Sequence, residues 1–152
     1  MQKKHIFWLI FIFPLALFAR APLFGDDAIL HLPEAILFVS LAGNEGMVRE
    51  ILSLGVDIDV RTAHGDTALH LAMFQDNMTV LALLLEYGFD PDAGNRSGDT
   101  AMHRAVTTDN VAAVRMLLHY GADKNKRNLA GRTPLQEAQR SGNRREIVFL
   151  LM

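Results

Sequence analysis

Three short phrases recur in this chain at an interval of 33 residues. They are Gly65-Asp66-Thr67-Ala68-Leu69-His70, Gly98-Asp99-Thr100-Ala101-Met102-His103 and Gly131-Arg132-Thr133-Pro134-Leu135-Gln136. Two further sets of residues keep the same period: Gly55, Gly88 and Gly121, and then Asn44, Asn77, Asn110 and Asn143. A fixed period of this length, carried by turn formers together with apolar residues, predicts a solenoid built by stacking one repeated supersecondary unit.

Each unit is predicted to hold two helices. A threonine hydroxyl caps the first helix, and Pro134 suits the first helical position of the last unit. The second helix is marked by a repeated apolar pattern. Its members are Leu81, Leu84 and Leu85, then Val114, Leu117 and Leu118, then Ile147, Leu150 and Leu151. Gly88 and Gly121 follow at the place where a helix end favours a residue of positive φ.

The same frame extends backwards to Ile36, although Leu32-Pro33-Glu34-Ala35 replaces the usual opening phrase. Terminal repeats commonly depart from the pattern because one of their faces meets solvent. We therefore expect an all-α solenoid of about four helix pairs with protruding turns or hairpin loops. The repeats would cover about 33–65, 66–98, 99–131 and 132–152 of one domain, residues 33–152.

The phrases Thr67-Ala68-Leu69-His70, Thr100-Ala101-Met102-His103 and Thr133-Pro134-Leu135-Gln136 resemble the Thr-Pro-Leu-His signature of ankyrin repeats. Alanine replaces the proline in two of the three phrases, and Gln136 replaces the histidine in the last. The resemblance covers roughly Pro33 to Met152. It implies a curved stack whose concave face binds other proteins, normally without catalysis.

The first residues have the pattern of a targeting segment. Lys3 and Lys4 precede an apolar run from Ile6 to Phe18, and Ala19-Arg20-Ala21 offers small residues at the spacing of a cleavage site. As a helix this run would span about 20 Å, less than the roughly 30 Å of a bilayer core. We expect residues 1–21 to be a signal peptide or an N-terminal anchor, followed by a linker over 22–32. The protein would then be exported, periplasmic or secreted, or alternatively anchored to a membrane and facing outside.

Charge is distributed unevenly along the chain. Thirteen acidic residues lie between Asp26 and Asp99 with only three arginines, whereas from Thr100 onwards nine Lys/Arg residues accompany four acidic ones. Such a gradient can steer partners. The basic half carries no interleaved aromatic residues, and the leader directs the chain out of the cytosol, so we expect no binding of nucleic acid.

No catalytic, metal or cofactor site is expected. The chain has no cysteine and lacks the HExxH, Walker and GxGxxG motifs. His70 and His103 occupy equivalent positions in adjacent units, and the family resemblance implies that they bond their own threonine and a connection. Asp57, Asp59, Asp90 and Asp92 recur on connections, where carboxylates bond backbone N–H groups.

The candidate site consists of residues that the repeat does not fix, on the connection tips and on the outer edge of the first helices. Aromatic and apolar anchors surrounded by arginine are typical of binding hot spots. The predicted set comprises Phe38, Leu71 and Phe74, framed by Arg61, Arg96, Arg104, Arg127 and Arg140. The alternative interpretation is that these apolar residues are scattered, or that they pair with the N-terminal segment.

These observations predict a non-catalytic, exported module that binds another protein through the concave face of the stack. The alternative is a membrane-tethered structural or assembly factor, with contact to a membrane only through an uncleaved leader. A competing surface is the C-terminal end, Ile147-Val148-Phe149-Leu150-Leu151, which has no obvious polar cap and could pair with another subunit.

Overall fold

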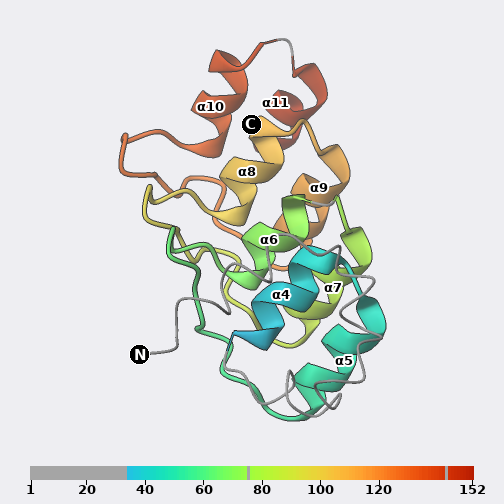
Figure 1. Cartoon of the computed structure of the whole chain (residues 1–152). Helices are drawn as coiled ribbons and strands as arrows, with labels where there is room; N and C mark the ends of the chain where they lie inside the picture. The colour runs from blue at the N-terminus through green and yellow to red at the C-terminus, as the bar shows by residue number, and fades with distance from the viewer. Residues whose placement is uncertain (1–33, 75, 143) are drawn as a thin grey trace.

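A computed structural model of the chain describes residues 34–74, 76–142 and 144–152. Within these ranges it contains eight helices and no strand (Figure 1). The helices are α4 (Ala35–Ala42), α5 (Glu45–Ser53), α6 (Ala68–Phe74), α7 (Met78–Glu86), α8 (Ala101–Thr107), α9 (Val111–His119), α10 (Pro134–Arg140) and α11 (Arg145–Leu151). The predicted leader and linker, residues 1–32, lie outside the described residues.

The helices form four consecutive pairs that stack in two layers. The first helices α4, α6, α8 and α10 contact one another in succession, and the second helices α5, α7, α9 and α11 do the same. The connections protrude on the side of the first helices (Figure 1). The all-α solenoid of four helix pairs that the repeats predict is thus confirmed for the described part of the chain.

Five of the described helices, α5, α7, α8, α9 and α10, begin where the sequence supplies a capping side chain. Thr100 accepts a hydrogen bond from the backbone N–H of His103, and Thr133 does the same for Gln136. The second helices α5, α7 and α9 are capped by the side chains of Asn44, Asn77 and Asn110. The asparagine period therefore marks the start of the second helices, where an asparagine carbonyl satisfies an otherwise unpaired N–H group.

The turns between helices also have local causes. Asp76 (φ 53°) and Asp109 (φ 58°) are left-handed, a conformation that aspartate tolerates better than most residues. The second helices α7 and α9 are followed by Gly88 (φ 90°) and Gly121 (φ 83°), as the sequence predicts. By contrast, Glu34 precedes α4 without a capping hydrogen bond from its side chain, in keeping with the altered opening phrase of the first repeat, and Arg144 precedes α11 in the same way.

One continuous apolar core runs between the two layers. Its fully enclosed members include Ile36, Ile51, Leu81, Leu84 and Leu117. These residues occupy apolar positions that recur in the first three repeats, and the last repeat contributes Ile147 to the same core. A single helix pair would leave this surface in water, so the stack is the unit that folds.

Candidate protein-binding surface

Each connection carries a tight turn at its tip. The backbone N–H of Thr62 bonds the carbonyl of Asp66 at 2.9 Å, and Asn95 and Asn128 bond Asp99 and Arg132 in the same way. Asn95 and Asn128 also accept hydrogen bonds from the backbone within their own turns. The three tips therefore share one conformation, because each begins with a side chain that accepts hydrogen bonds from the backbone, a threonine or an asparagine, and has a glycine at its fourth position.

Neighbouring tips are joined by backbone hydrogen bonds. The N–H of Arg96 donates to the carbonyl of His64 at 3.0 Å, and the N–H of Leu129 donates to Ser97 at 2.9 Å. A Cβ atom on Gly98 would lie 2.7 Å from the Leu129 nitrogen, and Gly98 also has a positive φ. Glycine is required here because both the close approach and the backbone conformation exclude a side chain.

Side chains connect the tips a second time. Asn95 donates to the Asp66 carboxylate at 2.9 Å, and Asn128 donates to Asp99 at 2.7 Å. Asn95 begins an Asn-X-Ser glycosylation pattern, but the nitrogen and the oxygen of its side-chain amide both already make hydrogen bonds. The row of tips is consequently a preorganised edge and not a set of independent loops.

The two histidines are structural, as the resemblance implies. His70 is 1% exposed, with Nδ1 close to the N–H and hydroxyl of Thr67 and Nε2 2.8 Å from the carbonyl of Asp99. His103 repeats this arrangement with Thr100 and Arg132. Burial lowers the pKa of His70 below its ordinary value of 6.5, although its hydrogen bond to Asp99 acts in the opposite direction. The neutral ring therefore links its own helix to the next connection.

The predicted apolar anchors do not form the exposed patch that the sequence suggested. Leu71 is only 7% exposed and belongs to the core, so the expectation that it is a surface anchor is wrong. Phe38, which lies one repeat earlier at the equivalent position, is half-buried. An apolar side chain on this edge is more stable packed inward than held in water. The side chain of Phe74 lies outside the described part of the structure, and its role stays a prediction.

The five predicted arginines differ in what they contact. Arg61 donates to the carbonyl of Gly94 at 2.8 Å and thereby bridges two connections. Arg127 donates to the carbonyl of Gly131 at 2.6 Å, within its own connection. Arg140 donates to Glu137 at 3.2 Å, while Arg104 is half-buried. Arg96 is exposed on its tip. Arg61 is thus partly structural, whereas Arg96 and Arg140 extend toward solvent.

Two features of this surface are missing from the predicted set. Leu129 is 81% exposed, at the tip position that Arg96 occupies one repeat earlier. Glu137 is only 4% exposed and pairs with Arg132 and Arg140. Burial alone would raise the pKa of Glu137, but the hydrogen bonds and charges of the two arginines lower it below its usual value. This carboxylate is ionised and holds both guanidinium groups in place.

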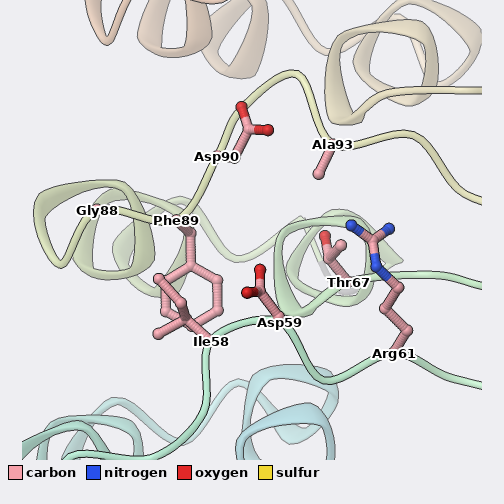
Figure 2. A pocket seen from close by; sticks show the side chains of 8 residues that line it. All are labelled: Ile58, Asp59, Arg61, Thr67, Gly88, Phe89, Asp90 and Ala93. Carbon is pink, nitrogen blue, oxygen red and sulfur yellow. The ribbon is translucent and has the colours of Figure 1, made fainter.

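A small pocket of about 80 Å³ lies between the first and second connections. Figure 2 shows the Asp59 carboxylate between the apolar pair Ile58 and Phe89 on one side and Arg61 on the other. Small-molecule sites are typically about 300 Å³ or larger, so this pocket is too small to enclose such a ligand. It is a crevice between repeats.

The acidic connection residues serve the backbone, as the sequence predicts. Asp57 and Asp90 each accept a hydrogen bond at 2.9 Å from the N–H two residues later. Among residues 34–74, 76–142 and 144–152 no group of three or more His, Cys, Asp or Glu residues is placed to hold a metal ion. A search of the same residues found no helix long and apolar enough to cross a membrane.

Comparison with known proteins agrees with this geometry. A family model described as ankyrin repeats, in three copies, matches residues 36–128. A search of curated proteins found no match. The matched range covers more than half of the chain and includes the first three helix pairs. The chain therefore belongs to the ankyrin-repeat family.

Proposed function

We propose that this chain is an exported, non-catalytic module that recognises a partner protein through the concave surface, defined as the connection tips and the exposed edge of the first helices. Ankyrin repeats are in general protein–protein interaction modules, and the family is typically non-catalytic. The observation that carries the proposal is the row of tips joined by both backbone and side-chain hydrogen bonds.

A rigid row of tips favours recognition because little conformational entropy is lost when a partner binds. It presents an exposed cation, Arg96, and an exposed apolar side chain, Leu129, at equivalent positions of successive repeats. The exposed Arg140 lies on the first helix of the last repeat. This composition suits a partner surface with carboxylates and at least one apolar residue.

The proposal is tested by capturing the partner from the native source and then measuring its affinity for single variants. Arg96→Ala and Leu129→Ala should each weaken binding by about tenfold or more if they are hot spots, and both should leave helicity unchanged. Phe74→Ala belongs in the same series as the remaining predicted anchor. Arg49→Ala is the matched control, because Arg49 is exposed on α5, away from the connection tips in the sequence, and pairs with Glu45 of the same helix.

The concave surface would be excluded as the binding site if the partner bound all four variants, Arg96→Ala, Leu129→Ala, Phe74→Ala and Arg49→Ala, with equal affinity. Arg104→Glu adds a kinetic test: slower association with a smaller dependence on salt is expected if this charge acts by steering.

Export is proposed from the leader alone, with its basic start, short apolar run and Ala19-Arg20-Ala21 site. The alternative is a membrane-tethered assembly factor that retains the leader as an anchor. N-terminal sequencing of the protein from its native source separates the two. A terminus near Arg20 or Pro22 supports a released protein, whereas an intact leader in the membrane fraction supports the anchored form.

Self-association through the C-terminal end is a second proposal for the same chain. The observation that favours it is the exposure of Phe149, which is 80% accessible on the last helix. An aromatic side chain in water is a typical centre for a protein contact.

A further inference from the structure

Each junction between neighbouring connection tips is made by the same three kinds of hydrogen bond. A backbone N–H donates to a carbonyl of the preceding tip, and an asparagine amide donates to an aspartate of the preceding repeat. A histidine Nε2 donates to a carbonyl of the next connection, because Nδ1 of the same ring accepts the threonine N–H. At the second junction these pairs are Leu129 with Ser97, Asn128 with Asp99, and His103 with Arg132. The first junction has all three bonds at the equivalent positions one repeat earlier.

The third tip is the last of the row, on the connection drawn in orange in Figure 1. A Cβ atom on Gly65 or Gly98 would lie 2.8 or 2.7 Å from the backbone nitrogen of the next tip. A Cβ atom on the equivalent Gly131 would meet no atom of the described residues within 4 Å, apart from those of its chain neighbours. The carbonyl of Ala130, equivalent to that of Ser97, accepts no backbone hydrogen bond from the described residues. The outer side of the third tip is therefore exposed.

The residues that follow this tip keep one of the two remaining contacts and reverse the other. Gln136 replaces the histidine, and its Oε1 accepts the N–H of Thr133 at 3.0 Å, as Nδ1 of the histidines does for theirs. The amide nitrogen of Gln136 is then the donor for a carbonyl, as Nε2 is in the histidines. Arg132 replaces the aspartate, so a donor stands where the preceding repeats have an acceptor. A segment beside this tip therefore needs a carboxylate where a further repeat supplies an asparagine.

The charge of this region also favours an acidic segment. Residues 124–140 contain five basic residues and one acidic residue, Glu137. Glu137 is buried, whereas Arg127 and Arg140 are exposed and 39% of the Arg132 side chain is accessible. The one carboxylate offsets a single guanidinium charge, so the end of the row attracts anions.

We propose that the outer side of the third tip binds an extended acidic segment of the partner protein. We call this site the open edge; it consists of Leu129, Ala130, Gly131, Arg132 and Gln136. The inference rests on the proposed function and adds the edge that receives the partner and the kind of segment that the partner presents. A backbone N–H of the segment donates to Ala130, a backbone carbonyl accepts from Gln136, and a carboxylate pairs with Arg132. An extended segment suits this edge because it presents backbone donors and acceptors along one side.

The test is an NMR titration of the full-length chain, labelled with nitrogen-15, with a synthetic peptide. The probe is Thr-Val-Glu-Val-Glu-Val-Thr with blocked termini, and the control peptide has lysine in place of both glutamates. The backbone signals of Leu129, Ala130 and Gly131 and the side-chain amide of Gln136 should shift with the acidic peptide. Its dissociation constant should be at least about tenfold lower than that of the lysine peptide, and salt raised from about 0.05 to 0.5 M should weaken its binding.

Two variants block the open edge and leave the core unchanged. Gly131→Asn places a side chain where the segment lies, and asparagine tolerates the positive φ of 73° at this position. Gln136→Glu keeps an oxygen that accepts the Thr133 N–H but replaces the donor by an acceptor. Each should weaken binding of the acidic peptide by about tenfold or more, with unchanged helicity. Gly55→Asn is the matched control, because Gly55 has the same φ and equal space around it but directly follows Leu54 at the end of the first repeat's second helix.

Three results would overturn the inference. Equal affinity for the acidic and the lysine peptide, or no shift with either, refutes an acidic segment at the open edge. Equal affinity of the Gly131→Asn, Gln136→Glu and Gly55→Asn chains for the acidic peptide places the peptide elsewhere. Shifts of Leu129 and Ala130 that grow with protein concentration in the absence of peptide assign the edge to a second copy of the chain. In all three cases the proposed function is still decided by Arg96→Ala and Phe74→Ala against the captured partner, because neither residue belongs to the open edge.

Discussion

Leu117 offers the most direct test of how the repeats hold together. Its side chain is fully buried in α9, with α7 on one side and α11 on the other. Leu150 occupies the same position one repeat later but is half-buried, because no further helix pair covers it among the described residues. The same substitution at these two positions therefore compares an enclosed site with an open one.

Leu117→Ala removes three carbon atoms from the core. At about 0.8 kcal/mol for each buried CH₂ group, the lost transfer free energy is about 2.4 kcal/mol. A cavity between three helices adds to this value, so we expect a loss of about 3 to 4 kcal/mol in the free energy of unfolding. Leu150→Ala should cost about half as much, because water and the neighbouring side chains can fill the space.

The measurement is equilibrium unfolding in urea, followed by far-ultraviolet circular dichroism. Leu129→Ala serves as the control and should change stability by less than about 0.5 kcal/mol, since this leucine is already in water. The slope of the unfolding free energy against urea must stay constant for the comparison to hold. If Leu117→Ala were no more destabilising than Leu150→Ala, the stack would not be held together by burial between repeats.

Three further predictions concern the polar contacts and the leader. Glu137→Gln should lower the free energy of unfolding by about 1 to 2 kcal/mol, a value that allows for the partial exposure of Arg132 and Arg140. If the variant were as stable in urea as the wild type, the contacts of Glu137 with the two arginines would not contribute to stability. The pKa of His70 is lowered from 6.5, so below this pH the unfolded chain binds a proton that the folded chain does not. The free energy of unfolding should therefore fall as the pH drops below about 6.5, by up to about 1.4 kcal/mol per pH unit. Urea unfolding at several pH values should show a smaller slope for His70→Gln, and an unchanged slope would assign the dependence to other groups. A chain that begins at Asp26 should still give a helical spectrum and a cooperative melt, and failure to fold would place residues 6–18 in the core.

The sequence by itself determined the architecture, because the features that define it are local. Threonine and asparagine caps, left-handed Asp76 and Asp109, and Gly88 and Gly121 act within a few residues along the chain. The 33-residue period then repeats these local instructions, and the apolar columns show which sides of the helices must meet. Helix pairs and turns followed from these residues, and the resemblance to ankyrin repeats implied the structural role of the histidines.

Only the tertiary structure decided which side chains the surface presents. Leu71, Arg104 and Glu137 occupy equivalent positions, yet Leu71 is in the core, Arg104 is half-buried and Glu137 is buried between two arginines. The exposure of a side chain depends on how the neighbouring repeat packs against it. That repeat lies about 33 residues away in the sequence, so the residues next to the side chain in the chain do not determine its exposure. For the same reason, the sequence indicated an apolar C-terminal end without an obvious polar cap, but only the packing of the last helix pair showed that Phe149 is exposed there while Ile147 and Leu151 are buried.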